Sequence, residues 1–285
     1  MNDRPENQFA RLATPAAAGM LLWISRTLLS VLIGYPILLA IRASSMTSGP
    51  DADSVLFRPG SLLLLELLRT GAPWLAAAAQ VALLLFGLST ILELVPLALA
   101  LDLLWLPGRP LLERLTRALR IFPRFLALGA IALLVQAALL LAASLLGAAL
   151  KPLLSSADER LRSILPLAPI ALGVIACGWF GGALDTARAA LVQQGELGAR
   201  AALAHALACL RQRPFSVLFG LYPSVAGSAL GVLSAAWLLT RFAPPSPSNL
   251  ALALSFGAHQ LATLFAISWR VRWLGTALEL SAEND

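Results

Sequence analysis

Residues 125–150, FLALGAIALLVQAALLLAASLLGAAL, decide the fold, because this long apolar stretch contains no charged side chain. Crossing the hydrocarbon core of a bilayer takes about 20 apolar residues in a helix. The 285-residue chain is 59% hydrophobic and only 13% charged, with a mean hydropathy of +0.80. Comparable runs recur along the chain and predict membrane spans at residues 20–41, 74–101, 125–150, 164–185, 215–240 and 250–270. We therefore predict an all-α fold, a polytopic membrane helical bundle with about six transmembrane helices.

The remaining segments are too short to form a separate soluble domain. None exceeds about 30 residues, which is below the length at which a chain buries a stable core by itself. We predict one membrane domain, residues 1–285, with a cytoplasmic leader at 1–19 and a cytoplasmic tail at 271–285. The first run exceeds the hydrophobic region of a typical signal peptide, and Arg42 stands where cleavage would need small residues. A retained first helix is therefore expected.

The basic residues are distributed unevenly between the two sides that six spans define. Of the 21 lysines and arginines, 13 fall on the side that carries both termini and 7 on the other, while Arg26 lies within the first span. Because cytoplasmic loops are enriched in these residues, both termini are predicted to be cytoplasmic. The net charge of +6 in so apolar a chain indicates contact with anionic membrane lipids rather than with nucleic acid.

Both cytoplasmic connections are predicted to form interfacial amphipathic helices. In the first, Glu113 and Arg117 lie on a polar face, whereas Leu115 and Leu119 lie on an apolar face. In the second, Gly195 is expected to end the preceding helix, and leucines at helical spacing follow it. Six arginines of these connections are expected to contact lipid headgroups: Arg114, Arg117, Arg120, Arg124, Arg211 and Arg213.

Two prolines suggest an internal repeat. When Pro123 is aligned with Pro214, each unit has an upstream helix that ends near an aspartate, Asp102 or Asp185, and each proline opens a transmembrane helix. We therefore predict two parallel units, each a helix, an amphipathic linker and a second helix; parallel repeats of this kind occur in some transporters. The alternative is that helical hairpins of this composition resemble one another.

Glu93 is the most conspicuous ionisable residue inside a predicted span. A charge within the bilayer costs about 2.5–3.5 kcal/mol on insertion scales and by default marks a functional-site hypothesis. Ser89 and Thr90 lie one turn before Glu93, and Pro96 follows it, a combination that can polarise a kinked helix. The alternative is that the span ends near Leu94, with Glu93 touching the cytoplasmic interface.

Other ionisable residues lie near span ends or in the last span. Asp102 and Asp185 are expected at the interface, where Asp185 and Arg188, one turn apart, can pair. His259 is either a proton relay or, as we prefer, a packing residue, because its own helix offers no carboxylate. The candidate intramembrane or interfacial polar site therefore comprises Glu93, Asp102, Asp185, Arg188 and His259.

Small and amide side chains predict how the helices pack. Gln136 and Gln260 are expected to hydrogen-bond neighbouring helices. The two cysteines are far apart and lack CxxC spacing, so they predict neither a disulfide nor a metal site. Two GxxxG motifs allow close approach of the fourth and fifth predicted helices to a partner helix: Gly178 with Gly182, and Gly227 with Gly231.

The sequence contains no catalytic motif. HExxH, GxSxG and Walker A patterns are all missing, and the chain has only 2 histidines. A nucleophile and a base at one membrane depth, which intramembrane hydrolysis would need, do not stand out. We therefore predict no enzyme activity, no metal and no cofactor.

Four segments carry a resemblance to known proteins: residues 53–60 (DSVLFRPG), 65–69 (LELLR), 185–188 (DTAR) and 211–214 (RQRP). Through them the chain resembles uncharacterised six-helix membrane proteins from high-GC bacteria such as myxobacteria. The resemblance spans most of the chain and implies a location in the bacterial inner membrane. It implies no biochemical activity.

Two hypotheses for function follow. The first is a non-enzymatic membrane subunit or scaffold, whose partners are anionic lipids and another membrane protein or a second copy of the chain. The alternative is a transporter or permease-like component, in which the acidic residues and Arg188 line a cavity between the two repeats. The arrangement of these charged side chains distinguishes the two hypotheses. In a transporter they must converge on a water-filled cavity, whereas in a scaffold they pair with nearby residues.

Overall fold

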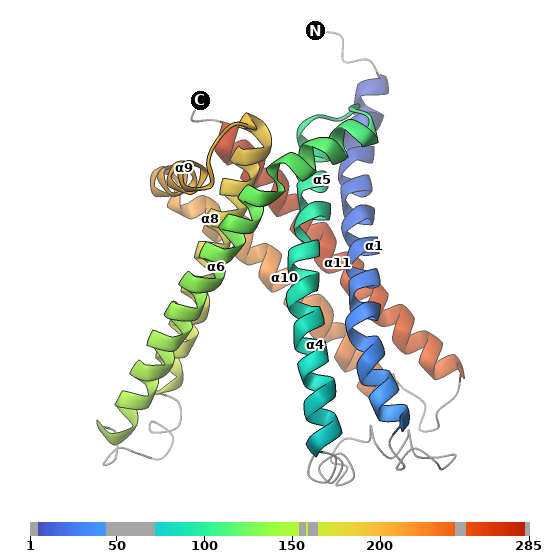
Figure 1. Cartoon of the computed structure of the whole chain (residues 1–285), viewed down its shortest axis with the longest axis vertical. Coiled ribbons are helices and arrows are strands. Elements are labelled where there is room, and N and C mark those ends of the chain that lie inside the picture. Colours follow the sequence, from blue (N-terminus) through green and yellow to red (C-terminus); the bar gives the residue numbers. More distant parts are fainter. Residues whose placement is uncertain (1–4, 44–71, 154–157, 159–164, 243–248, 283–285) are drawn as a thin grey trace.

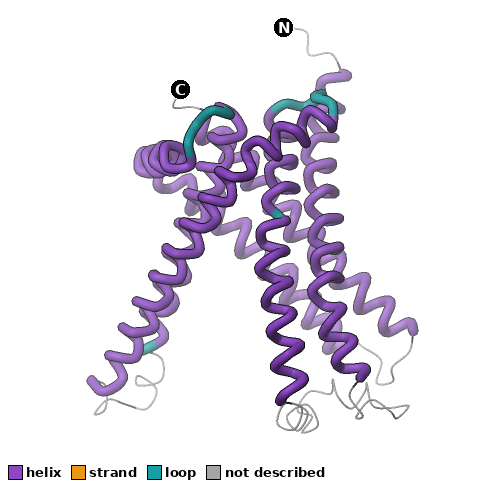
Figure 2. Tube along the Cα trace, in the orientation of Figure 1, coloured by secondary structure: helices purple, strands orange, loops and turns teal. Residues whose placement is uncertain are grey.

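The computed structural model describes residues 5–43, 72–153, 158, 165–242 and 249–282. All regular secondary structure in this part of the chain is helical (Figure 2), which confirms the all-α prediction. The helices are α1 (Pro5–Ala43), α4 (Ala72–Leu92), α5 (Leu94–Trp105), α6 (Leu111–Leu153), α8 (Leu167–Gln194), α9 (Ala199–Gln212), α10 (Pro214–Phe242) and α11 (Asn249–Ala282).

Four helical segments are long and apolar enough to cross a membrane, and they indicate a membrane protein. The predicted spans at 215–240 and 250–270 lie in α10 and α11, which are helical but are not among these four. Six crossings therefore remain a prediction. The four segments are Thr14–Tyr35 in α1, Leu83–Trp105 across α4 and α5, Leu111–Leu150 in α6 and Leu167–Gln194 in α8.

The second predicted span is divided at Glu93, and Pro96 is the physical cause. Proline has no backbone N–H and clashes with the carbonyl four residues earlier, which here belongs to Leu92, the last residue of α4. The chain nevertheless continues in the same direction into α5 (Figure 1), since the Leu97 N–H donates to the Glu93 carbonyl at 3.1 Å. The break leaves Glu93 at a kink in the middle of the helix pair.

The two predicted linkers differ in structure. Pro214 begins α10, as predicted, but Pro123 lies inside α6, contrary to the prediction that it opens a helix. The first linker and the third predicted span are thus one long, bent helix, whereas the second linker is the separate helix α9, which Figure 1 shows nearly end-on. The internal repeat and the interfacial position of both linkers remain predictions.

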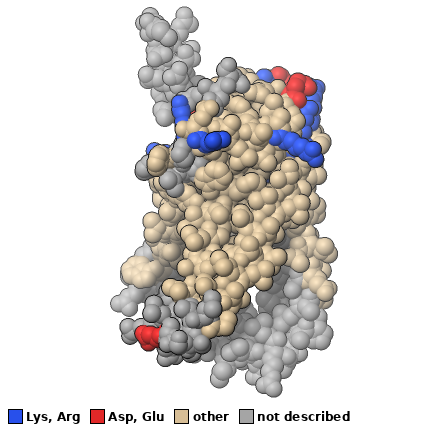
Figure 3. All heavy atoms as spheres, turned by 90° about the vertical axis from the view of Figure 1, so that its left-hand side faces the viewer, with Lys and Arg blue, Asp and Glu red and all other residues tan. Residues whose placement is uncertain are grey.

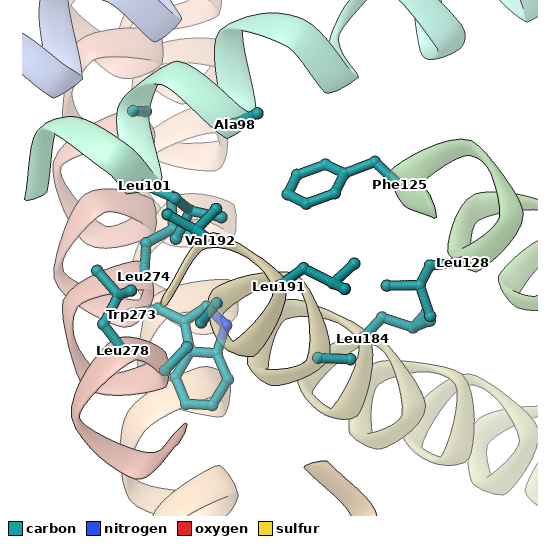
Figure 4. Packing of buried hydrophobic residues seen from close by; sticks show 14 of the residues in the cluster. Ala98, Leu101, Phe125, Leu128, Leu184, Leu191, Val192, Trp273, Leu274 and Leu278 are labelled. Carbon is teal, nitrogen blue, oxygen red and sulfur yellow. The ribbon is translucent and has the colours of Figure 1, made fainter. Parts of the chain in front are cut away.

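The buried core lies at one end of the molecule, where α5, α6, α8 and α11 meet (Figure 4). Leu101, Phe125, Leu191 and Trp273, one from each helix, are at most 1% exposed. Helices α5 and α8 end here and α6 begins here. We call this the polar end, because the buried charged residues Asp102, Arg114 and Asp185 lie on these three helices. From the polar end the α6–α8 pair and the α1–α4 pair diverge toward the opposite end (Figure 1).

Residues 271–282, which the sequence assigns to a tail, are helical and pack in this core, and their cytoplasmic location remains a prediction. Helix α11 continues to Ala282, and Trp273, Leu274, Ala277 and Leu278 are each at most 4% exposed. Their spacing places them on one face of a helix. Hydropathy alone ended the last span near Arg270, but the apolar stripe continues through the following turns and packs α11 against α8 and α1.

Glycines on α10 admit the aromatic side chains of α11. A Cβ on Gly227 would lie 2.8 Å from the Trp269 indole, and a Cβ on Gly231 would lie 2.8 Å from the Phe265 ring. Contacts this close are possible only because glycine has no side chain. The second predicted GxxxG motif therefore lies in a helix interface. In the first motif, Gly178 faces Tyr222 of α10, at 3.6 Å from an added Cβ, and Gly182 is buried.

Away from the polar end the helices expose apolar side chains. Leu83 and Leu84 of α4 and Leu133 and Leu134 of α6 are each more than 70% exposed. On the face shown in Figure 3, the basic side chains gather near one end, above a broad belt of uncharged residues. An apolar exterior of this extent needs a lipid or protein environment.

Gly227→Ala is expected to lower the thermal midpoint of the detergent-solubilised protein, because the added Cβ meets the rigid Trp269 indole. Overpacking a core costs about 1–3 kcal/mol, which outweighs the gain of about 1 kcal/mol that alanine has over glycine in a helix interior. The matched control is Gly129→Ala in α6, where a Cβ would meet nothing within 4 Å, and this variant should be neutral or more stable. Equal midpoints for the two variants would contradict the close α10–α11 packing.

Candidate functional site

Asp102 is a buried carboxylate surrounded by arginines. It lies in the last turn of α5 and is 2% exposed. Arg109 and Arg114 donate hydrogen bonds to its two oxygens at 3.2 and 3.1 Å, and a terminal nitrogen of Arg117 lies 3.4 Å from Oδ1. A charge buried in this way is tolerated only when it is paired and hydrogen-bonded. We call Asp102 with these three arginines the Asp102 cluster.

The turn between α5 and α6 brings these arginines to Asp102. Gly108 has a φ of +100°, a backbone conformation that residues with a side chain rarely adopt. This conformation helps the chain reverse direction, so that the first turns of α6 return over the end of α5. Arg114 also donates to the carbonyls of Leu106 and Arg109 at 2.7 and 2.8 Å. The side chain thus satisfies backbone acceptors just beyond α5, where helix ends lack intrahelical partners.

Asp185 is the second buried carboxylate, and it joins α8 to α11. Arg270 binds it with both terminal nitrogens, at 2.5 and 2.8 Å, and the Trp273 indole donates to it at 2.9 Å. Arg188, one turn along α8, donates at 3.2 Å, so the predicted local pair forms. Paired bonds from one guanidinium are among the stronger hydrogen bonds in proteins. We call these residues the Asp185 cluster.

Arg117, already part of the Asp102 cluster, and Arg124 hold the end of α8. Arg117 donates to the Val192 carbonyl, and Arg124 donates to the Gly195 carbonyl. Gly195 ends α8 with a φ of +65°, as the sequence predicts. Charged donors here satisfy carbonyls that a helix C-terminus leaves without an intrahelical partner.

A polar chain of contacts extends from α8 to α9 and α11. The Gln193 side chain donates to the Leu278 carbonyl at 2.8 Å and accepts from the Ser281 hydroxyl at 2.9 Å. A ring nitrogen of His205 lies 3.2 Å from the Ser281 carbonyl. This network could not be predicted from the sequence, because its members are far apart in the chain and each is individually an ordinary polar residue.

Glu93 pairs with Arg26 of α1 at 3.0 Å, and both side chains are 40% exposed. The sequence placed both residues inside predicted spans but did not predict the pair. The contact connects the α4–α5 kink to α1. Glu93 is therefore paired with a cation on a neighbouring helix rather than left alone in an apolar environment.

The predicted polar site is divided among different environments. Asp185 and Arg188 are together, Asp102 has its own arginines, and Glu93 has Arg26. His259 is exposed on α11. The structure thus places the three carboxylates in separate groups of ion pairs, and it adds Arg270 and Trp273, which the prediction missed.

The six arginines expected to contact lipid headgroups also separate into two groups. Arg114 is only 4% exposed, and Arg117 and Arg124 are partly buried with backbone carbonyl partners. These three bind groups of the protein itself, so the buried Arg114 is not a surface residue, while headgroup contact by the partly buried Arg117 and Arg124 remains a prediction. The other three are exposed: Arg120, Arg211 and Arg213.

Amide side chains join neighbouring helices as predicted. Gln136 of α6 donates to the Cys177 carbonyl of α8 at 3.3 Å. Gln260 of α11 accepts from the Trp23 indole of α1 at 3.0 Å. Both contacts are of the kind that fix helix pairs where water is scarce.

The site chemistry is that of charge neutralisation between helices. The described residues contain no group of three or more His, Cys, Asp or Glu side chains placed to hold a metal ion. A pocket of about 710 Å³ lies beside the Asp102 cluster and is lined by residues of α6 and of the α8–α9 connection. No protein-family model, curated protein or solved structure matches the chain.

Asp185→Asn is expected to destabilise the protein strongly, because Arg270 and Arg188 would keep their charges without a buried carboxylate. Removing one partner of a buried pair costs about 3–5 kcal/mol. Glu93→Gln is the comparison, since it removes one ion pair between partly exposed side chains, whereas Asp185→Asn leaves two arginines without their buried carboxylate. Thermal midpoints of both variants in one detergent provide the measurement. A smaller loss for Asp185→Asn than for Glu93→Gln would refute this role of the Asp185 cluster.

Arg114→Ala and Arg120→Ala are expected to differ although both residues lie on the first turns of α6. Arg114→Ala removes the donor to Asp102 Oδ2 and to two backbone carbonyls, which should cost about 2–4 kcal/mol. Arg120 is exposed, and surface substitutions typically stay within about 0.5 kcal/mol. Denaturant unfolding of the two variants, followed by circular dichroism, separates them. Similar losses would mean that Arg114 is not the internal anchor of this turn.

Proposed function

We propose that this chain is a non-enzymatic integral membrane protein, a subunit or scaffold that engages anionic lipids and a membrane-protein partner. The observation that carries the proposal is the local pairing of every predicted site carboxylate. Asp102, Asp185 and Glu93 each bind arginines that belong to adjacent turns or helices. Such contacts fix helix positions and leave no acidic side chain of this set to bind a substrate cation or to relay protons.

The exposed apolar surface supports the second part of the proposal. Side chains such as Leu84 and Leu133 lie on diverging helix pairs, and nothing else in the described chain covers them. Lipid tails or the helices of another membrane protein have the matching chemistry. A scaffold uses such faces, whereas an enzyme or a transporter also needs an interior site.

A transporter or permease-like component is the alternative function. It would need Asp102, Asp185 and Glu93 to line a common water-filled path. The pocket beside the Asp102 cluster is lined by none of these three carboxylates. The arrangement therefore favours the scaffold, although the transporter remains testable.

The proposed location is the bacterial inner membrane with both termini in the cytoplasm. The excess of arginine on the termini-bearing side supports this orientation. The N-terminal end of α1 and the C-terminal end of α11 lie at the same end of the molecule (Figure 1), as an even number of crossings requires. The sequence resemblance to six-helix inner-membrane proteins supports the same location.

Native mass spectrometry of the protein, extracted gently from its own membrane, tests the proposal. The expected result is a protein partner in fixed stoichiometry, with anionic lipids attached. Glu93→Gln should leave this complex unchanged, because the Glu93–Arg26 pair joins two helices of the same chain. A specific small ligand that is bound by the natural chain and lost on Glu93→Gln would instead establish the transporter.

A further inference from the structure

The pocket beside the Asp102 cluster has the composition of an anion site. It lies between the first turns of α6 and the connection from α8 to α9, and its volume of about 710 Å³ falls within the range of ligand sites. Arg109, Arg117 and Arg120 line it together with two acidic residues, Glu113 and Glu196. The lining therefore carries an excess of one positive charge.

Arg120 is the arginine best placed to bind a ligand. It is exposed and has no ion-pair partner among the described residues. Arg117 and Arg109 are 22% exposed and are fixed from behind by Asp102, so their positions are set before any ligand arrives. Guanidinium groups held in place bind phosphate oxygens through paired hydrogen bonds.

Glu113 is the natural competitor for such an anion. Its carboxylate pairs with Arg109 at 3.0 Å and is 58% exposed. An exposed pair of this kind contributes little to folding and is readily exchanged. An incoming phosphate can therefore take over the contact with Arg109 without unfolding the turn.

The surroundings of the pocket match a lipid rather than a soluble anion. Leu111 and Leu112, at the start of the same helix, are 73% and 76% exposed, and Leu119 is 55% exposed. On the face shown in Figure 3, basic side chains gather at one boundary of the uncharged belt. A headgroup at that boundary can place its acyl chains along exposed leucines.

We propose that this pocket binds the phosphate of an anionic phospholipid. Arg120 and Arg117 hold the phosphate oxygens, Arg109 exchanges its contact with Glu113 for the ligand, and the leucines of α6 contact the acyl chains. The inference rests on the proposed membrane location and assigns the lipid contact to one site rather than to the basic surface as a whole.

The experiment titrates the purified full-length chain, in a delipidating detergent, with short-chain phosphatidylglycerol and follows binding by native mass spectrometry. Arg120→Glu should weaken binding at least about tenfold, because it replaces a charge-assisted bond with repulsion. The matched control is Arg211→Glu, an exposed arginine of α9 that does not line the pocket, and it should change affinity by less than about twofold. Glu113→Gln should strengthen binding, because it removes the competitor of the phosphate.

Three outcomes would overturn the assignment. Equal losses for Arg120→Glu and Arg211→Glu would show diffuse binding to a basic surface. If the Glu113→Gln variant bound the lipid no more tightly than the natural chain, the proposed exchange of Arg109 from Glu113 to the phosphate would be wrong. Glycerol phosphate bound as tightly as phosphatidylglycerol, with the same sensitivity to Arg120→Glu, would assign the pocket to a soluble phosphate compound.

The failure of this inference and the failure of the scaffold proposal can be distinguished. Partner capture from the native membrane tests the scaffold, and the detergent titration tests only the pocket. A chain that retains its protein partner but fails the titration keeps the proposed function and loses the lipid site. If the chain binds the lipid in the titration but captures no protein partner, the lipid site is supported and the scaffold proposal is wrong.

Discussion

The carboxylate of Asp185, buried where α8 and α11 cross, imposes the central constraint on this structure. Transfer of an isolated carboxylate out of water is very unfavourable, so a buried aspartate must have cations and hydrogen-bond donors around it. Arg270, Arg188 and Trp273 supply them. Because two of these residues belong to α11, that helix has to extend past its apolar run and dock on α8. The burial of Leu274 and Leu278 follows from the same docking.

The two buried aspartates are satisfied in different ways, which bears on the internal repeat. Asp102 is surrounded by arginines from the α5–α6 turn and from the first turns of α6. Asp185 takes its main partner from a helix 85 residues further along the chain. Similar positions at helix ends thus solve the same electrostatic problem with local contacts in one case and long-range contacts in the other. An ancestral duplication would have to accommodate this divergence.

The sequence predicted the elements better than their contacts. Long apolar runs identify helices without knowledge of their neighbours, and Asp185 with Arg188 is visible because the two lie one turn apart. Arg270 was not predicted as a partner, since nothing local links it to Asp185. The kink at Glu93 had a readable signal in Pro96, whose missing N–H ends α4 at Leu92. The packed C-terminal end of α11 also had a readable signal, the apolar stripe that begins at Trp273.

The first turns of α6 show how arginines of a predicted interfacial helix come to face the protein as well as its surface. A helix on a water-soluble protein directs leucines inward and arginines outward, whereas the predicted interfacial helix directs its leucines toward lipid. Here Arg114 is buried while Leu112 and Leu119 are exposed. Arg114, Arg117 and Arg124 share a face with Ile121, and that face meets Asp102 and the carbonyls at the end of α8. This reversed arrangement is stable only if the exposed leucines meet an apolar medium, so the local packing of one helix favours a membrane environment independently of hydropathy. In the same segment Arg120 is exposed, so its guanidinium stays outside the core while Arg114, Arg117 and Arg124 bind groups of α5 and of the end of α8.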